Sequence, residues 1–202
     1  MVLHHTAMAT AEAALERLRD PAAEVSAHYL IAGNGRVWRL VAEDRRAWHA
    51  GAGAWGDARD VNSRSIGIEL ANPGDAPFPA PQTAALATLL RGVLARWAIP
   101  PERVIGHACM APERKQDPSA RFDWRALARE GLSVWAEATG AAPADAAAFA
   151  VAARAFGYPP AEPAALLAAF RRRFRPGAAG PLTGEDVATL AALAARWPVG
   201  RG

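Results

Sequence analysis

The chain is poor in cysteine and lacks any long apolar run. Its 202 residues include a single cysteine, Cys109, so no disulfide can form within one chain. No apolar stretch approaches the roughly 18 residues that a membrane-spanning helix requires. No basic segment is interleaved with aromatic residues, which argues against nucleic-acid binding. We therefore expect no internal disulfide, no transmembrane segment and no nucleic-acid partner.

The start of the chain also lacks the charged residues and apolar run of a signal peptide. Its first apolar residues, Val2 and Leu3, are followed at once by His4 and His5. We therefore expect either a cytoplasmic protein or a protein of the cell envelope or periplasm whose export signal is missing from this chain. We expect the protein to act as a monomer.

The overall composition is that of a folded protein. Hydrophobic residues make up 51% of the chain and charged residues 21%, which is typical of a soluble globular protein and excludes a disordered one. The formal net charge of +3 is mild and compatible with an anionic partner such as a cell-wall polymer. A chain of this length can form one medium-sized domain and a small one.

The first two thirds of the chain alternate between strand and helix patterns. Strand patterns bounded by turn residues occur at Val2–Thr6, Ala27–Ala32, Arg36–Val41, Ser65–Leu70 and Val104–His107. Helical patterns occur at Ala9–Arg19, Pro81–Trp97 and Trp124–Glu137. Gly33-Asn34-Gly35 predicts a hairpin, and Glu43–Asn62 predicts a long functional loop. We predict an α/β domain over residues 1–138, with a mixed β-sheet flanked by helices.

The sequence changes character after residue 138. Thr139–Ala144 is typical of a linker, and three helical patterns without any strand follow it, at Ala146–Phe156, Pro163–Phe174 and Gly184–Arg196. Proline pairs and a Pro-Gly step separate these patterns. Thr183 and Asp186 predict a capping box at the start of the last helix. We predict a second, small all-α domain of three helices over residues 145–202.

One segment, Gly106–Pro118, combines several residues that are suited to chemistry. It follows a short apolar run, and we predict that it is irregular because its prolines oppose a helix. It contains His107 and Asp117, which are both zinc ligand types. A third ligand such as His4 would complete a catalytic zinc site with one position left for water.

Two further residues could complete a hydrolytic site. In Ser65–Leu70 the isoleucines and the leucine share one face of the strand, which leaves Glu69 on the other face. A carboxylate in so apolar a run is costly to bury unless it is paired or functional. Glu69 could accept the proton of the attacking water. Lys115, two residues before Asp117, could stabilise the oxyanion that forms.

Structural roles for the same residues stay open. A single histidine near a strand end is more often a hydrogen-bonded structural residue than a ligand, and only one of His4 and His5 can face a given site. We interpret His28 as structural and His49 as a pocket residue. Glu69 could simply pair with an arginine, and Lys115 could be solvated. Cys109 lies nearby, but a thiol nucleophile explains the pattern no better than zinc does.

The motifs, taken in order, resemble those of the zinc-dependent N-acetylmuramoyl-L-alanine amidases of the bacterial type 2 family, which are related to the peptidoglycan recognition proteins. The likeness runs through Val2–Ala7, Val25–Leu30, Trp48–Gly51, Ser65–Leu70, Gly106–His107, Lys115–Pro118 and Phe122–Trp124. It implies a zinc ion bound by His4, His107 and Asp117, with Glu69 as base and Lys115 as transition-state partner. We expect substrate contacts from Trp48, His49, Asn62 and Asn72.

The C-terminal helices resemble a small peptidoglycan-binding module through Phe170–Pro176 and Gly180–Thr183. A catalytic domain joined to such a module is similar to the envelope-associated amidases, which cleave both intact and anhydro-muropeptides. Some positions depart from the family pattern. Ala108-Cys109 replaces a common Ser-Asp, Ala71 replaces a second acid, and Asp60 stands where an arginine is usual. We expect the loss of the acid at Cys109 to remove a polar neighbour of the site.

The resemblance implies hydrolysis of the amide between N-acetylmuramic acid, intact or in its 1,6-anhydro form, and L-alanine in peptidoglycan or muropeptides. A non-catalytic peptidoglycan recognition module is an alternative, as is a zinc peptidase acting on the stem peptide. Zinc content separates the first alternative from the amidase, and the masses of the products separate the second.

Overall fold

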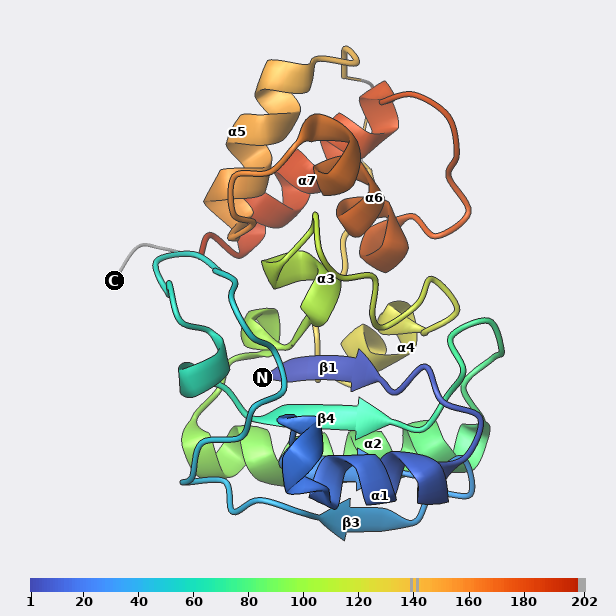
Figure 1. Cartoon of the computed structure of the whole chain (residues 1–202). Coiled ribbons are helices and arrows are strands. Elements are labelled where there is room, and N and C mark those ends of the chain that lie inside the picture. Colours follow the sequence, from blue (N-terminus) through green and yellow to red (C-terminus); the bar gives the residue numbers. More distant parts are fainter. Residues whose placement is uncertain (139, 141, 200–202) are drawn as a thin grey trace.

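A computed structural model describes residues 1–138, 140 and 142–199, and shows a five-stranded mixed sheet in the order β3-β2-β4-β1-β5 (Figure 1). The strands are β1 (Val2–His5), β2 (Tyr29–Ile31), β3 (Val37–Arg39), β4 (Gly67–Leu70) and β5 (Ile105–Gly106). β2, β4, β1 and β5 are parallel neighbours, and only β3 runs antiparallel, to β2. The predicted mixed sheet is therefore confirmed. The linker predicted at Thr139–Ala144 and the predicted end at residue 202 lie partly outside the described residues.

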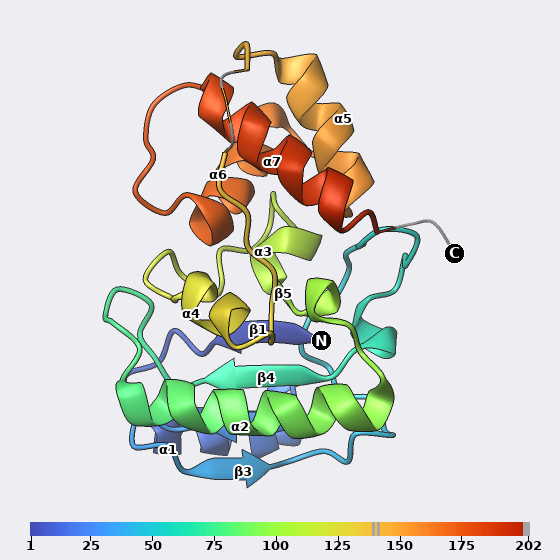
Figure 2. The same ribbon diagram turned by 180° about the vertical axis from the view of Figure 1, so that it is seen from behind.

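Helices cover both faces of the sheet. α1 (Ala11–Arg19) lies on one face, and α2 (Ala80–Trp97) and α4 (Trp124–Arg129) lie on the other, as Figure 2 shows from behind. Ile68 and Leu70 on the apolar face of β4, and Ile66 just before the strand, pack against Leu86 and Leu90 of α2 in one hydrophobic cluster. The opposite face of β4 carries Gly67 and Glu69. The alternation predicted for this strand is confirmed, and it leaves Glu69 on the face away from α2.

The long helix and the hairpin form as their sequences predict. Prolines begin α2, and Ala98 ends it in the left-handed conformation. Trp97 is an exception to the apolar stripe of α2, because it is 47% exposed and its indole Nε1 donates to Glu43 at 2.6 Å. At the hairpin Gly35 has a φ of +87°, and a Cβ there would lie 2.8 Å from the carbonyl oxygen of Pro81. Glycine is required at this position for both reasons.

Two predicted elements were wrong. The helix predicted over Trp124–Glu137 ends at Arg129, because Gly131 adopts a φ of +71° and the chain then turns away. The segment Gly106–Pro118, predicted to be irregular, opens with one helical turn, α3 (His107–Met110). The amide of Ala111 donates to the carbonyl of His107 at 3.1 Å. The prolines lie beyond this turn and so do not oppose it.

The three C-terminal helices have the predicted bounds: α5 (Ala146–Phe156), α6 (Pro163–Phe174) and α7 (Gly184–Arg196). The capping box of Thr183 and Asp186 is present. The helices pack on the side of the sheet where β5 and α3 lie, as Figure 2 shows, and α6 contacts both α3 and α4. One hydrophobic cluster joins them to the sheet and includes Val2 and Ile105 as well as Phe156 and Phe170. The C-terminal helices and the α/β part therefore share a continuous core.

The loop between β3 and β4 bridges the two parts. Trp55 is 4% exposed and its ring centroid lies 5.5 Å from that of Phe156 and 5.1 Å from that of Tyr158. The amide of Gly56 donates to the carbonyl of Gly157 at 2.8 Å. A Cβ at Gly157 would lie 2.7 Å from the Trp55 ring, so this docking requires glycine.

None of the helices in the described part of the chain combines the length and the hydrophobicity that a membrane span requires.

Candidate active site

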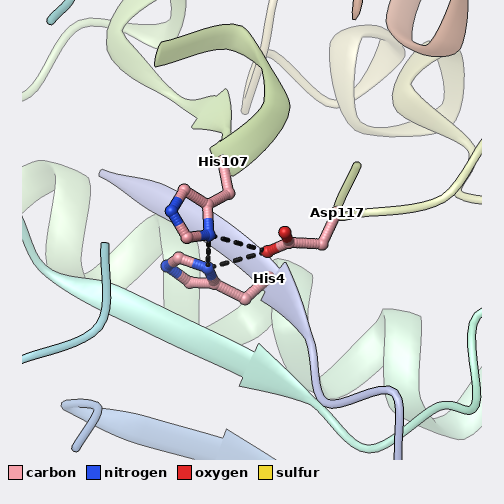
Figure 3. Close-up of side chains that lie close together, drawn as sticks. All are labelled: His4, His107 and Asp117. Atoms are coloured by element: carbon pink, nitrogen blue, oxygen red, sulfur yellow. Dashed lines mark hydrogen bonds and ion pairs between the residues drawn. The ribbon is translucent and has the colours of Figure 1, made fainter. Parts of the chain in front are cut away.

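Three side chains from distant parts of the sequence meet beyond the carboxyl ends of β1 and β5. His4 lies near the end of β1, His107 follows β5 directly, and Asp117 comes from the loop after α3. Nδ1 of His4 lies 3.0 Å from Nδ1 of His107 and 2.9 Å from Oδ2 of Asp117. Nδ1 of His107 lies 3.1 Å from the same oxygen. Figure 3 shows the three atoms forming a small triangle.

The protonation of both rings suits a metal ion at this triangle. Nε2 of His107 lies 2.8 Å from the carbonyl oxygen of Ala50 and must donate to it, which leaves Nδ1 with its lone pair. His4 is 1% exposed, and burial lowers its pKa to about 4, so its ring is neutral at pH 7. Two neutral imidazoles and one carboxylate are a donor set that binds zinc in hydrolases, with a fourth position left for water. The residues present therefore fit a zinc ion.

Glu69 and Lys115 line the same cavity as the triangle. The cavity has a volume of about 410 Å³. Glu69 stands opposite His4 in the parallel register of β4 and β1, so both side chains leave the sheet on one face. Lys115 lies two residues before Asp117 in the same loop. Five residues that were predicted to work together are thus placed around one cavity.

The environment of Glu69 makes its carboxyl group a weak acid. Oε2 of Glu69 is buried and has no hydrogen-bond partner among the described residues. Burial, and next the nearby charge of Asp117, raise the pKa of Glu69 to about 8, while the charge of Lys115 acts in the opposite direction. A divalent cation at the triangle would favour the ionised carboxylate by the same Coulombic argument. Glu69 is therefore suited to exchange a proton near neutral pH.

The other predicted site residues divide into two groups. Trp48 and His49 line the cavity, and Trp48 is 56% exposed with the Arg46 guanidinium 3.8 Å from its ring centre. Asn62 and Asn72 are only 2% and 3% exposed and do not line it. Asn62 bonds to the loop 47–50, and Asn72 bonds to the turn that follows β4. Their burial is at odds with the predicted substrate contacts.

Cys109 does not adjoin the site as its sequence position suggested. Its side chain is 2% exposed, and its sulfur lies 3.8 Å from the Tyr158 hydroxyl and 3.9 Å from Nη1 of Arg173. These partners belong to the C-terminal helices and the turn after α5. The helical turn α3 explains the difference, because it directs His107 and Cys109 to different surroundings. The departure at Cys109 therefore affects the packing of the two parts and leaves the cavity lining unchanged.

The sequence prediction missed the wall that α1 contributes. Ala14, Arg17 and Leu18 line the cavity, together with Thr6, Met8, Val25, Ser26 and Gln116. The spacing of Ala14, Arg17 and Leu18 shows that they share a helix face. Nothing in the sequence indicates that this face meets the site. The supporting role of the Ala50 carbonyl was also missed, because a main-chain oxygen carries no sequence signal.

Comparison with known proteins identifies the family. Residues 1–120, more than half of the chain, match the family described as N-acetylmuramoyl-L-alanine amidase. N-acetylmuramoyl-L-alanine amidase AmiD of Escherichia coli (strain K12) is 41% identical over 154 residues, 68% of this chain and 55% of that protein. The 1,6-anhydro-N-acetylmuramyl-L-alanine amidase AmpD of Citrobacter freundii is 38% identical over 100 residues, 50% of this chain and 54% of that protein.

A solved structure extends the likeness to the whole chain. E. coli AmiD, in complex with the substrate anhydro-N-acetylmuramic acid-L-Ala-D-gamma-Glu-L-Lys, matches with a TM-score of 0.90 and 34% identity. The match covers 98% of this chain and 89% of the AmiD chain. The sequence matches, in contrast, span only about half the length of the two curated relatives. The family match and the fold agree, and the chain belongs to the N-acetylmuramoyl-L-alanine amidase family.

Proposed function

We propose that the protein is a zinc hydrolase that cleaves the amide bond between N-acetylmuramic acid and L-alanine in peptidoglycan or muropeptides. The observation that carries this proposal is the triangle of His4, His107 and Asp117, with Glu69 and Lys115 on the same cavity. The likeness to AmiD, which was solved with a muropeptide substrate, supports the choice of bond and of substrate class. The 1,6-anhydro form of the sugar is included in the proposal.

His4, His107 and Asp117 would hold the zinc ion. Bound there, zinc would polarise the carbonyl of the scissile amide and lower the pKa of a water molecule. The chain's own contribution begins with Asp117, whose carboxylate balances part of the metal charge. The two histidines contribute through Nδ1, and the hydrogen bond from Nε2 of His107 to the Ala50 carbonyl fixes the orientation of that ring.

Glu69 would act as the general base. Glu69 lines the cavity, and its carboxylate can take the proton of the attacking water. The protonated Glu69 can then deliver that proton to the nitrogen of the departing L-alanine. The burial that raises the pKa of Glu69 favours the protonated form that this second step requires.

Lys115 would stabilise the negative oxygen of the tetrahedral intermediate. It is the only lysine of the chain, whereas all other basic side chains, apart from histidine, are arginines. A lysine carries a compact charge on a flexible stem, which can follow an oxygen that gains charge during the reaction. The choice of lysine at this single place supports a specific role for its ammonium group.

The exposed ring of Trp48 would form part of the substrate-binding surface. Arg46 covers one side of this ring, at 3.8 Å from the ring centre. The ring borders the cavity together with Val25 and Ser26. Substrate contact by Trp48 is therefore retained in the proposal, whereas the contacts predicted for Asn62 and Asn72 are not.

The proposal also includes two functional parts, a catalytic part over residues 1–138 and a peptidoglycan-binding part over residues 145–202. The AmiD structure covers 98% of this chain, whereas the AmpD sequence match covers 50%. Phe170–Pro176 and Gly180–Thr183 resemble a wall-binding module. This resemblance agrees with the AmiD match, which includes the C-terminal helices. An amidase that binds the wall polymer would work at the cell envelope, and we include that location in the proposal.

The test is the release of intact stem peptide from purified muropeptides, followed by mass spectrometry. We expect products whose masses correspond to cleavage at the lactyl–L-alanine amide, and loss of activity in Glu69→Ala and His107→Ala. Undiminished activity in either variant would contradict the mechanism. A zinc-free, inactive protein that still sediments with cell wall would favour the recognition module, and cleavage within the stem peptide would favour a peptidase. Substrates with intact and anhydro sugar, assayed in parallel, show whether both are cleaved.

A further inference from the structure

The loop Ala47–Ala50 contacts both metal-ligand histidines from behind. Nε2 of His4 lies 3.0 Å from Nδ1 of His49. Nε2 of His107 lies 2.8 Å from the carbonyl oxygen of Ala50, the next residue along the chain. Each ligand histidine therefore has its second ring nitrogen bound by one short loop, while its first nitrogen faces the triangle.

The contact with His49 selects the form of His4 that can bind a metal. Nε2 of His49 lies 3.4 Å from the carbonyl oxygen of Ser65, which can only accept a hydrogen bond. Nε2 of His49 therefore carries the proton of that ring, and its Nδ1 is an acceptor. In the hydrogen bond between His4 and His49, Nε2 of His4 must then be the donor. Nδ1 of His4 keeps its lone pair as a result. The opposite arrangement would point an N–H into the triangle and exclude a cation.

Asn62 holds this loop in place with three hydrogen bonds. Its Oδ1 accepts from the amide of His49 at 3.0 Å and from the amide of Ala50 at 2.8 Å. Its Nδ2 donates to the carbonyl of Ala47 at 2.9 Å. The side chain is 2% exposed, so the loop amides have no competing water here. One carboxamide thus fixes the backbone at both residues that contact the ligands.

Two further contacts complete the support. Nη2 of Arg114 donates to the carbonyl of Ala50 at 2.8 Å, so this oxygen accepts from both His107 and Arg114. A Cβ at Gly67 of β4 would lie 2.3 Å from Cγ of His49 and 2.5 Å from its Nδ1. The His49 ring therefore rests directly on the backbone of β4, two residues before Glu69. The ring has little freedom to move away from His4.

We infer that Asn62 and His49 are positioning residues for the metal site, with His49 orienting His4 and Asn62 fixing the loop that orients both ligand histidines. This inference rests on the proposed function in one respect, because it requires that His4 and His107 bind zinc. It replaces direct substrate contact as the role of Asn62. Outer contacts of this kind commonly change metal affinity by about 10- to 100-fold when they are removed.

The chain offers matched controls for both residues. Asn72 is 3% exposed and pins a turn by the same chemistry, accepting from the amide of Gly74 at 2.7 Å and donating to the carbonyls of Ala76 and Pro77. Its side chain makes no hydrogen bond to His4, to His107 or to the loop Ala47–Ala50 in the described structure. Asn72→Ala therefore shows how much stability is lost with a buried asparagine while the contacts behind His4 and His107 stay intact. For His49, the change to asparagine keeps an acceptor near the position of Nδ1, and the change to leucine removes it.

The experiment measures the zinc dissociation constant of the full chain by competition with a chromophoric chelator. We expect the zinc dissociation constant to rise by about 10- to 100-fold in Asn62→Ala and in His49→Leu. We expect His49→Asn to recover most of the affinity, and Asn72→Ala to bind zinc like the unmodified protein even if its melting temperature falls. Wild-type zinc affinity in folded Asn62→Ala and His49→Leu overturns the inference. If Asn62→Ala does not fold, the two His49 variants decide alone.

The same samples separate this inference from the proposed function. Tight zinc binding that needs His49 and Asn62, without cleavage of muropeptides, would refute the amidase and leave the positioning role intact. Unchanged zinc affinity in the variants, with full amidase activity, would refute the positioning role and leave the amidase intact. A chain that binds no zinc through His107, shown by an unchanged affinity in His107→Ala, would refute both.

Discussion

Two groups of buried polar side chains meet at α3, and they differ in what encloses them. His107 belongs to the first group, which faces an open cavity with Glu69 and Asp117. Cys109 belongs to the second, which is centred on Arg173 between the sheet and the C-terminal helices. One helical turn therefore contributes to a site that can accept a ligand and to an interior that is closed.

Main-chain, side-chain and aromatic partners hold the closed group, and only Nε of Arg173 lacks a hydrogen-bond partner among the guanidinium nitrogens in the described structure. Arg173 is 2% exposed, and its Nη2 donates to the carbonyl of Val104 at 2.9 Å and to Oγ of Ser133 at 3.3 Å. The guanidinium lies 4.6 Å from the ring centre of Trp124 and 4.7 Å from that of Phe174. No carboxylate forms an ion pair with it among the described residues.

The open group is left incomplete by the protein itself. Oε2 of Glu69 has no partner in the described structure. Nδ1 of His4, Nδ1 of His107 and Oδ2 of Asp117, the proposed metal ligands, lie within about 3 Å of one another. Unpaired buried polar atoms are costly for stability. The buried polar groups near α6 therefore stabilise the packing of the C-terminal helices on the sheet, whereas those at the ends of β1 and β4 remain free to bind a ligand.

The largest effect is expected for Glu69→Gln, which removes the base and keeps the shape. We expect kcat to fall by about 10²- to 10⁴-fold, the usual range for loss of general acid–base catalysis. Stability at neutral pH should be equal or higher, because a carboxyl group whose pKa rises to about 8 on folding costs stability above its unfolded pKa, and glutamine carries no such cost. Steady-state kinetics and thermal melts check the two parts. A large loss of stability would mean that Glu69 belongs to the closed, structural kind of group.

The matching change in the closed group is Arg173→Ala. It leaves a void and an unpaired carbonyl at Val104, and we expect a loss of about 3 kcal/mol in the free energy of unfolding. Arg154→Ala on the exposed side of α5 is the control, and should change stability by less than about 0.5 kcal/mol. Denaturant titration measures both. Equal effects of the two substitutions would contradict the structural role given to Arg173.

Chemical modification of Lys115 should have the next largest effect. Because it is the only lysine, amine reagents can reach only its side chain and the N-terminal amine. Acetylation, which removes the charge, should lower kcat by about 10²-fold, and reductive methylation, which keeps the charge, should lower it less. The Lys115→Arg variant, treated with the same reagents, corrects for modification of the N-terminus. Full activity after complete acetylation would remove Lys115 from the mechanism.

A smaller, pH-dependent effect is expected in the C-terminal helices. Burial alone would raise the pKa of Asp186, but hydrogen bonds led by that from Arg171 hold it well below its usual range. A lowered folded-state pKa gives stability that is present above the unfolded pKa near 3.8 and is lost as the pH falls below it. We expect a slope of about 1.4 kcal/mol per pH unit there from this group. Asp186→Asn should be less stable at neutral pH and should lack that part of the slope in acid denaturation curves.

The sequence predicted the elements whose ends are marked by local signals. The bounds of α5, α6 and α7 were predicted to the residue, because Asp145, Pro163 and the capping box at Thr183 mark their starts. The helix at Trp124 was predicted too long, since its end depends on the backbone conformation of Gly131. Local signals describe short-range geometry, and they do not show where a helix must stop for tertiary reasons.

The site was partly predictable for a similar reason. Strand alternation indicated that only one of His4 and His5 could face the site, and the family resemblance pointed to His4. Alternation also placed Glu69 opposite the apolar face of its strand, which packs against α2 in the structure. The support behind the proposed ligands could not be predicted, because it depends on hydrogen bonds that Asn62 accepts from loop amides more than ten residues earlier in the chain. The surroundings of Cys109 likewise follow from the packing of α6 against α3. Contacts of this range become visible only in the folded structure.

The most direct test of the central claim is removal and return of zinc in one muropeptide assay. A chelator is used to strip the purified protein, which is then divided and assayed with and without one equivalent of zinc, and the products are weighed by mass spectrometry. We expect release of the intact stem peptide, with a free L-alanine amino terminus, only in the zinc-loaded half. Equal release in both halves, or cleavage at another bond, would contradict it.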